Sequence, residues 1–429
     1  MKRYKYSDLT ASDIQKLVQR NVDPANEVRA IVEEVIAEVK KDGDTALISF
    51  GARFDNVELE KLYLDKDELT TIAASVTDKQ KAALALAYAN IYKFHEAQFK
   101  AEDKIETMSG VTCWRELRPI EKVGLYIPGG SAVLPSTFLM LGIPARIAGC
   151  DEIVVCSPPQ KDGKVNAFIA FVALKLGIER IYLAGGAQAI AAMAYGTDTI
   201  AKVDKIFGPG NQFVTKAKTI VQSTTTTAID MPAGPSEVLV IADETCMPAY
   251  VAADLLAQAE HGPDSQAILV CTSSKIADDI LAEVEKQTIT LLRAEIVRAA
   301  LGNSYIVITN SLDEAMSFSN AYAPEHLILA TLGWEPLIAG ILNAGSVFLG
   351  NLTPESAGDY ASGTNHTLPT SAFARAYSGV SVDSFVKKIT FQHITPRGLE
   401  NIGPSVEILA ELEGLDAHKN AVSVRLANE

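Results

Sequence analysis

Gln258 and His261 are the first residues whose types and spacing suggest chemistry. They lie near the end of an expected helix, 254–261, which Gly262 and Pro263 would terminate. Side chains three positions apart share one face of a helix, so the amide and the imidazole would point the same way. Two neutral donors at a helix end are able to hold a divalent metal ion, although an ordinary polar edge explains the same pair.

Glu325 and His326 form a second candidate site, a carboxylate beside an imidazole at the entrance of an expected strand, 327–330. Adjacent residues of a regular strand point to opposite faces of the sheet, whereas an irregular entrance lets both side chains reach one site. An imidazole titrates near neutral pH, so this pair suits general acid and base catalysis.

Three glycine-containing turns follow expected strands and are candidates for binding an anionic group such as a pyrophosphate. Glycine lets the backbone approach a ligand closely, and the helix that follows presents free N–H groups. None of these turns has the G-x-G-x-x-G spacing, so tight strand-to-helix turns without a ligand explain the glycines about as well. The turns are residues 128–131, 185–188 and 208–211.

The elements that must position these residues are short apolar runs that alternate with helical stretches after about residue 120. This alternation is typical of parallel sheets with crossover helices. A long polar loop, 350–369, follows the last run, and long loops of this kind usually serve function. Residues 1 to about 120 look mainly helical. The expected strands are 123–127, 152–156, 180–184, 204–207, 237–242, 266–272, 305–309, 327–330, 346–349 and, near the C-terminus, 386–391.

We therefore expect an α/β fold with two doubly wound, incompletely Rossmann-like parallel-sheet domains. A helical N-terminal region would precede them, and a small extended C-terminal tail used in dimerisation would follow. Ligands of such sheets bind beside the carboxyl ends of the strands, so the site is expected in a cleft between the two sheets.

The composition limits the classes of partner. The 429 residues include 48% hydrophobic and 21% charged residues, which is typical of a globular chain of two or more domains. A net charge of −15 disfavours binding to nucleic acid or to an anionic membrane. No run of about 18 apolar residues and no signal sequence is visible, so a soluble, cytoplasmic protein is expected. The five cysteines are widely spaced, which argues against a disulfide framework or a thiolate zinc cluster.

Seven segments together resemble the histidinol dehydrogenase family. They follow the order of the family's motifs, cover nearly the whole chain and show no departure at the motif positions. Chance agreement of this extent is negligible. The segments are 123–130, 206–211, 232–237, 258–261, 322–327, 358–366 and 413–418.

The resemblance implies NAD-dependent oxidation of L-histidinol through L-histidinal to L-histidine, the last step of histidine biosynthesis. It implies one zinc ion per subunit and the consumption of two NAD molecules. In this interpretation Glu325 and His326 are catalytic: His326 takes the hydroxyl proton, and Glu325 activates the water that hydrates the aldehyde. The implied zinc ligands are Gln258, His261, Asp359 and His418.

The resemblance also implies the contacts to the two small molecules. Glu413 and His418 would come from the other subunit, so a homodimer would be needed for a complete site. The implied NAD contacts are Tyr126, Gln188 and Asn211. The implied substrate contacts are Ser236, Gln258, His261, His326, Asp359, His366, Glu413 and His418.

The expected domain division follows from the same interpretation. Residues 1–22 form an N-terminal segment that packs with the tail, and residues 23–122 with 236–380 form a larger α/β domain that holds the metal and catalytic residues. Residues 123–235 form an inserted NAD-binding α/β domain, and residues 381–429 form the dimerisation tail.

Other interpretations stay open. A related zinc- and NAD-dependent alcohol dehydrogenase would act on another small polar alcohol. A metal-dependent hydrolase would use Glu325 to activate a zinc-bound water and would not reduce NAD, and a catalytically silent metal-binding or assembly protein would do neither. Within the aldehyde step, Cys113 or Cys150 offers a thiohemiacetal route, although neither has a neighbour in sequence that would lower its pKa.

Overall fold

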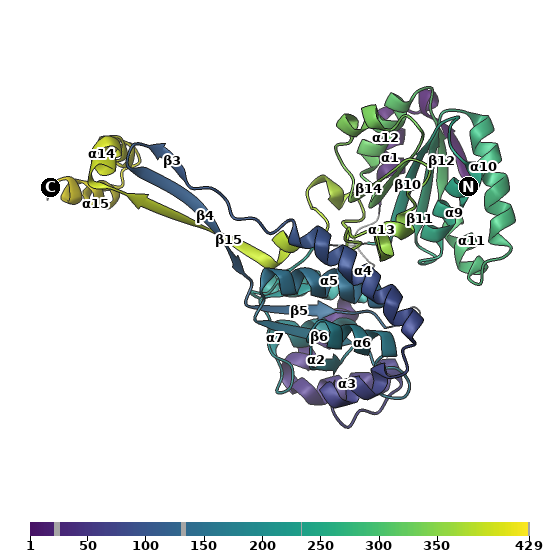
Figure 1. Cartoon of the computed structure of the whole chain (residues 1–429), viewed down its shortest axis with the longest axis horizontal. Helices are drawn as coiled ribbons and strands as arrows, with labels where there is room; N and C mark the ends of the chain where they lie inside the picture. Colours follow the sequence, from purple (N-terminus) through teal and green to yellow (C-terminus); the bar gives the residue numbers. More distant parts are fainter. Residues whose placement is uncertain (21–25, 130–133, 233, 428–429) are drawn as a thin grey trace.

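The computed structural model describes residues 1–20, 26–129, 134–232 and 234–427. Two six-stranded sheets covered by helices form the body of the molecule, and a long arm extends from it (Figure 1). The expected α/β fold with two largely parallel sheets is confirmed. The turn at 128–131 and the motif at 232–237 lie partly outside the described residues, as does the expected boundary after residue 22. No helix of the described part is long and apolar enough to cross a membrane.

The first sheet, called sheet I here, has the strand order β2-β7-β6-β5-β8-β9. Neighbouring strands run parallel except β2 and β7. Val123 and Leu125 of the central strand β5 are fully buried, as expected for a parallel strand covered on both faces. The elements are β2 (Tyr63–Leu64), β5 (Lys122–Tyr126), α5 (Pro135–Ala148), β6 (Glu152–Ser157), α6 (Ala167–Lys175), β7 (Ile181–Leu183), α7 (Gly186–Tyr195), β8 (Lys205–Phe207), α8 (Gln212–Thr224) and β9 (Ala228–Ile229).

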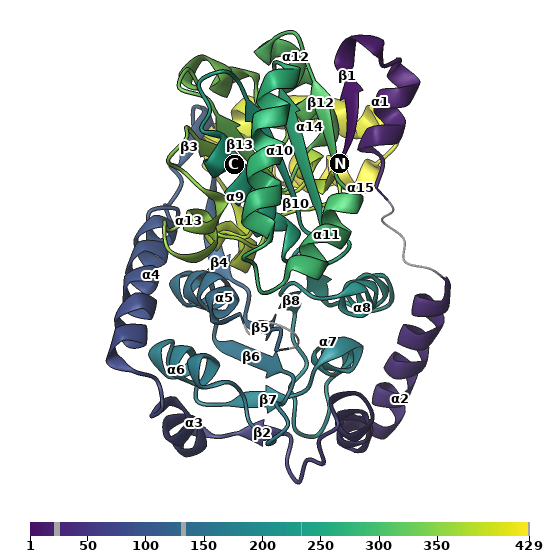
Figure 2. The same ribbon diagram turned by 90° about the vertical axis from the view of Figure 1, so that its right-hand side faces the viewer.

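Three earlier helices, α2, α3 and α4, also cover sheet I. Helix α2 packs against α7 and α8, α3 against α6, and α4 against α5 (Figure 2). Val32 and Val39 of α2 belong to the same apolar core as the strands of sheet I. The structure thereby corrects the expected division, which placed 23–122 with 236–380, because helical periodicity identifies an apolar face but not the sheet that it covers. The bounds are α2 (Asn26–Phe50), a π-helical turn (Gly51–Asp55), α3 (Lys66–Ala73) and α4 (Asp78–Glu96).

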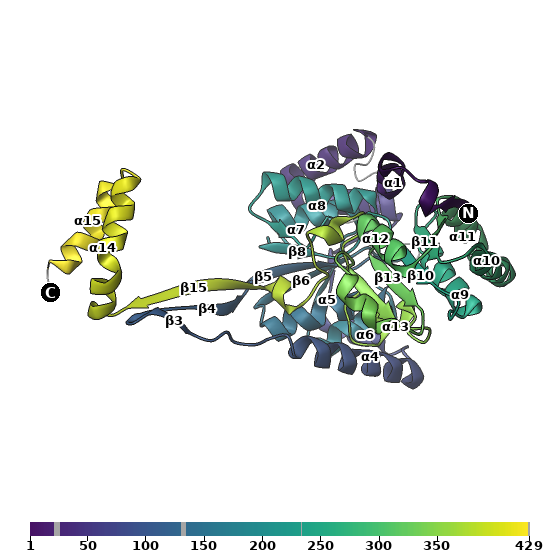
Figure 3. The ribbon, with the colours of Figure 1, turned by 90° about the horizontal axis from the view of Figure 1, so that it is seen from above.

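The second sheet, sheet II, has the order β1-β12-β11-β10-β13-β14 and is parallel throughout. The N-terminal segment forms its edge: β1 pairs with β12, and α1 packs against α12. Residues 1–20 therefore join sheet II, and the described part of the tail of their own chain lies at the opposite end of the molecule (Figures 1 and 3). The bounds are β1 (Lys2–Lys5), α1 (Ala11–Val18), β10 (Glu237–Ala242), α9 (Pro248–Ala259), β11 (Gln266–Cys271), α10 (Ser274–Thr288), α11 (Ala294–Gly302), β12 (Tyr305–Ile308), α12 (Leu312–Tyr322), β13 (His326–Ala330) and β14 (Ser346–Leu349).

The arm consists of a three-stranded antiparallel sheet, β15-β4-β3, with α14 and α15 at its tip (Figure 3). Residues 105–119 were expected to be mainly helical but supply β3 and β4, because β4 pairs along its length with β15 from the distant C-terminal segment. Leu409 and Leu412 of α14 are 60% and 78% exposed. Such exposed apolar side chains are typical of a subunit contact. The bounds are β3 (Ile105–Met108), β4 (Val111–Pro119), β15 (Val386–Ile394), α14 (Pro396–Leu412) and α15 (Asp416–Leu426).

Candidate active site

The carboxyl ends of the sheet I strands face the amino ends of the sheet II strands. Asn211, after β8 of sheet I, and His261, after α9, line the same two cavities. The strands of both sheets were expected to direct their carboxyl ends at the site. In sheet II the structure differs, because Glu325 and His326 lie at the start of β13 and Ser236 directly precedes β10.

One residue of β10, Glu237, holds both members of the acid–base pair. Its backbone N–H donates to Oε2 of Glu325 at 2.9 Å, and its carbonyl lies 3.2 Å from Nδ1 of His326. Because a carbonyl only accepts, Nδ1 carries a proton, and Nε2 is the ring atom left to exchange one. This Nε2 lies 3.5 Å from Oδ1 of Asp359. The left-handed Ala323 (φ 54°) after α12 creates the irregular strand entrance that lets both side chains serve one site.

Gln258 is fully buried on the last turn of α9, and neither of its amide atoms has a hydrogen-bond partner among the described residues. Leaving a buried amide unpaired costs roughly 1–3 kcal/mol, so this side chain is prepared to bind a group from outside the chain. His261 follows just beyond the helix and opens to the cavities. The pair expected from helical spacing therefore lies at the helix end.

Asp359 lies on α13 (Glu355–Tyr360), a short helix within the segment 350–369 that was expected to be a loop. Helix α13 packs against α9. One ligand atom each from His261, Glu355 and Asp359 lies within 4.8 Å of the other two. Glu355 was missed by the sequence analysis, and both of its carboxylate oxygens are buried without a partner in the described chain. Its spacing of four from Asp359 would have indicated a shared face if a helix had been expected there.

Burial and close charges shift the pKa values of this cluster. Burial raises the pKa of Glu325 to about 7 and that of Glu355 well above its ordinary value. Burial opposes the charged form of Asp359 too, but the neighbouring His326 holds its pKa below the usual range. For His326, burial lowers the pKa, yet Glu325 and Asp359 outweigh burial and raise it. The cluster is therefore able to bind protons or a cation between its carboxylates and its imidazoles.

His366 connects this cluster to sheet I. Its Nδ1 donates to the backbone carbonyl of Asp359 at 2.8 Å, and its Nε2 accepts from the hydroxyl of Thr137 on α5 at 2.9 Å. Burial lowers the pKa of His366, which favours the neutral ring that this pairing requires. Ser236 and His261 both line a polar cavity of about 890 Å³. Ser236 and His366 thus lie beside the cluster.

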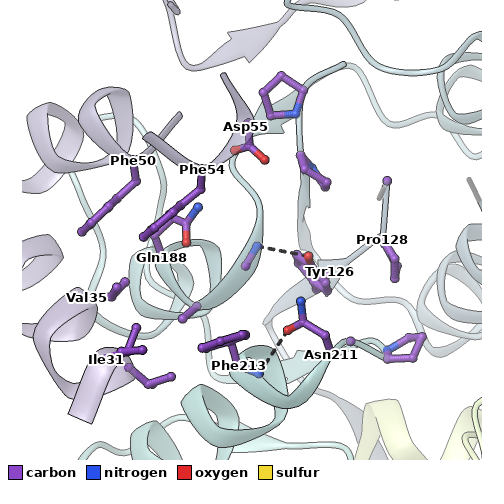
Figure 4. Close-up of a pocket in the computed structure, with 18 of the residues that line it drawn as sticks. Ile31, Val35, Phe50, Phe54, Asp55, Tyr126, Pro128, Gln188, Asn211 and Phe213 are labelled. Carbon is purple, nitrogen blue, oxygen red and sulfur yellow. Dashed lines mark hydrogen bonds between the residues drawn. The ribbon is translucent and has the colours of Figure 1, made fainter. Parts of the chain in front are cut away.

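A second cavity, of about 780 Å³, opens at the carboxyl edge of sheet I. Tyr126, Gln188 and Asn211, the three expected NAD contacts, all line it (Figure 4). Tyr126 accepts a hydrogen bond from the N–H of Gly186 at 3.1 Å, and Asn211 caps the N-terminus of α8. The positive N-terminal ends of the α7 and α8 dipoles would favour an anionic group here.

The opposite wall of this cavity is mainly apolar, although Glu34, Arg53 and Asp55 also line it. It comes from α2 and the turn that follows it, which contribute Ile31, Val35, Phe50 and Phe54 (Figure 4). No site residue was expected in this region, because the sequence shows no cluster of catalytic residue types there. An apolar wall facing polar turns suits a ligand with a flat ring and charged groups.

The histidinol dehydrogenase family model matches residues 18–426. The chain belongs to the histidinol dehydrogenase family. A histidinol dehydrogenase from Bacteroides fragilis is 54% identical over 426 residues, which are 99% of each chain. A crystal structure of histidinol dehydrogenase from Elizabethkingia anophelis has a TM-score of 0.96 and 53% sequence identity, and the match covers 100% of this chain and 98% of that one.

A plant histidinol dehydrogenase, from Arabidopsis thaliana, is 52% identical over 431 residues, covering 99% of this chain and 91% of that protein. It is described as chloroplastic, which concerns the plant protein. The cytoplasmic location expected for this histidinol dehydrogenase family member stays a prediction.

Within one chain, two of the expected site residues lie far from the cluster. Glu413 directly follows α14 and His418 lies on α15, and both are exposed. These helices form the tip of the arm, whereas α13 and α9 belong to the body (Figures 1 and 3). A single chain therefore brings together the expected residues of the body but not those of the arm.

Proposed function

We propose that this protein is a histidinol dehydrogenase that oxidises L-histidinol through L-histidinal to L-histidine with two molecules of NAD⁺. The observation that carries the proposal is the joint attachment of Glu325 and His326 to Glu237, with Nε2 of His326 directed at Asp359. An imidazole and a carboxylate held at one point supply the proton transfers of both oxidations.

The proposed zinc ligands are Gln258, His261 and Asp359 of one subunit and the partner subunit's His418. The unpaired amide of Gln258 and the close approach of His261 and Asp359 support this set, and its oxygen and imidazole donors suit zinc. Glu355 offers a further oxygen in the same cluster. When bound, the zinc ion would hold the imidazole and amine of the substrate and so fix the position of its carbinol carbon.

In the first oxidation the neutral form of His326 accepts the hydroxyl proton at Nε2 while the carbinol carbon loses a hydride to NAD⁺. A cation bound at Asp359 would favour this neutral form, because it offsets the carboxylate charge that raises the pKa of His326. The hydrogen bond from Nδ1 to the Glu237 carbonyl keeps Nε2 directed into the site. In the second oxidation Glu325 takes a proton from water as the water oxygen bonds to the aldehyde carbon, and His326 returns its proton to the aldehyde oxygen. The resulting hydrate loses a hydride to a second NAD⁺ and a proton to His326. Because burial raises the pKa of Glu325 to about 7, this carboxyl group is matched to proton transfer near neutral pH.

Additional substrate contacts are proposed from Ser236 and His366 and from the partner subunit's Glu413. The proposed NAD contacts are Tyr126, Gln188 and Asn211. A thiol route is not part of this proposal: burial raises the pKa of Cys150 to about 11, and Cys113 lies on β4 of the arm.

Counting NADH tests the reaction and the metal requirement together. Purified protein given limiting L-histidinol and excess NAD⁺ is expected to form two NADH per histidinol, since two hydrides leave the substrate. Chelation should abolish this activity, and zinc should restore it. One NADH per histidinol, or full activity after verified metal removal, would contradict the proposal. Absence of NADH would also contradict it, and other small polar alcohols and then hydrolase substrates would be tested next.

Gly208 offers a test of the nucleotide cavity. It has φ 129°, and an added Cβ would lie 2.2 Å from the carbonyl oxygen of Tyr126. Gly208→Ala should displace Tyr126 and raise the KM for NAD by roughly tenfold, a loss of about 1.4 kcal/mol in binding. The control is Gly149→Ala, which has φ 82° but meets no atom within 4 Å, so it should lower the melting temperature without changing this KM. An unchanged KM in folded Gly208→Ala would argue against a nucleotide at this edge.

A further inference from the structure

Arg20, at the end of the described N-terminal segment, inserts its guanidinium between two elements of sheet II. The side chain is 11% exposed. Nη1 donates to the backbone carbonyls of Val18 and Tyr322, each at 2.7 Å, and Nη2 donates to Oε1 of Glu237 at 3.0 Å. The guanidinium carbon also lies 3.9 Å from the centre of the Tyr322 ring. One planar cation thus ties the C-terminus of α12 to the start of β10, an arrangement that suits the rigid fork of arginine.

The side chain of Glu237 has further partners. Its Oε1 accepts from the backbone N–H of Ser371 at 2.7 Å, and the Tyr322 hydroxyl lies 3.1 Å from its Oε2 and 2.6 Å from Oε1 of Gln266. Glu237 is 2% exposed, so its carboxylate depends on these donors in place of water. Removing Arg20 would leave the carboxylate without its only described cationic partner and would favour a shift of the residue.

The backbone of Glu237 also holds the catalytic pair, Glu325 and His326. Its N–H bonds Glu325 and its carbonyl bonds His326, while Arg20 holds the chain at Tyr322, three residues before Glu325. A change in the position of Glu237 therefore moves both proton-transferring groups at once. Active-site geometry is sensitive to such movements, because a displacement of about 1 Å is able to lower a rate by about a hundredfold.

We propose that Arg20 is a positioning residue of the active site, which acts through Glu237 to set the orientation of Glu325 and His326. This inference rests on the proposed function, since the two groups it positions are the proposed acid and base. Arg20 does not line the nucleotide cavity, but it lines the polar cavity together with Ser236 and His261. The KM for histidinol is therefore measured beside kcat, and a positioning role predicts that the loss falls mainly on kcat.

The test compares Arg20→Lys with Arg3→Gln. Lysine keeps the charge but loses the fork that joins Glu237 to the Tyr322 carbonyl. Arg3, from the same N-terminal segment, pairs with Asp278 at the surface and does not touch Glu237. We expect Arg20→Lys to lower kcat for histidinol by roughly tenfold to a hundredfold with the KM for NAD within about twofold, and Arg3→Gln to change neither.

Tyr322→Phe provides a second variant in case Arg20→Lys does not fold. It keeps the ring under the guanidinium and removes the hydroxyl that lies between Glu237 and Gln266, so a smaller loss of kcat with the same KM for NAD is expected. A folded Arg20→Lys with wild-type kcat would overturn the proposal, as would a KM for NAD that rises in step with the loss of kcat. If Arg20→Lys does not fold, wild-type kcat in Tyr322→Phe would overturn it.

A measurement without substrate separates this proposal from the proposed function. In protein labelled with ¹⁵N-histidine, the Nδ1–H signal of His326, assigned by its loss in His326→Asn, reports the bond to the Glu237 carbonyl. This signal should persist in Arg3→Gln and should shift or broaden in Arg20→Lys. An unchanged signal in Arg20→Lys would reject the positioning role, whereas a wild type that forms no NADH from histidinol would reject the proposed function alone.

Discussion

Glu325→Gln is expected to slow the oxidation of L-histidinal by about 10²- to 10⁴-fold while the oxidation of L-histidinol to the aldehyde changes far less. The amide oxygen of glutamine is able to accept from the Glu237 N–H as the carboxylate does, so the local structure should persist. An amide does not take a proton from water, however, and hydration of the aldehyde then loses its base. His326 keeps its bond to the Glu237 carbonyl and still serves the first oxidation.

The two steps are separated by giving the enzyme each substrate in turn under single-turnover conditions and following NADH. Glu244→Gln is a suitable control, since Glu244 is exposed just after β10, at the carboxyl edge of sheet II and so away from the pair. Equal losses in both oxidations would mean that Glu325 and His326 do not have the separate roles proposed.

A mixed dimer of His326→Asn and His418→Asn subunits is expected to keep about half of the wild-type activity, although each variant alone should be nearly inactive. If the arm of each subunit completes the site of its partner, the mixed dimer contains one site with both mutations and one with neither. If each arm served its own body, every site would carry one mutation and the mixed dimer would be inactive.

Two affinity tags, one on each subunit, isolate the mixed dimer for this assay. The reciprocal control combines wild type with a His326→Asn, His418→Asn double variant, for which an exchanged arm predicts no activity and an unexchanged arm predicts about half. The two mixtures contain the same mutations, so general loss of stability affects both alike. Activity in the control mixture, or none in the first, would reject the shared site.

Local patterns predicted part of the site because helical spacing and strand entrances are properties of neighbouring residues. Gln258 and His261 were predicted as a pair from their spacing, and the structure places them at the end of α9. Glu355 was missed because its polar surroundings resemble a loop, and α13 is held by packing against α9. A helical pattern identifies the apolar face of a helix but not the element against which that face packs.

Long-range contacts explain the remaining differences. Glu237 and Tyr322, the residues that Arg20 contacts, lie 217 and 302 positions away from it in the chain. No short sequence window contains the three residues together. The strands of residues 105–119 depend on β15 in the same way. All nine strands expected in the two sheets form close to their predicted positions, because the apolar runs that bury both faces of a parallel strand are themselves local.

The pairing of β1 with β12 has a consequence for synthesis on the ribosome. Residues 2–5 are made before all of sheet I, yet their hydrogen-bonding partners, residues 305–308, are made only after it. Strand β1 therefore has no β12 to pair with until residues 305–308 have been made. Arg20 likewise lacks its partner until Tyr322 has been made. Sheet I is able to assemble while the chain is still growing, whereas sheet II closes late, when its oldest and some of its youngest strands meet.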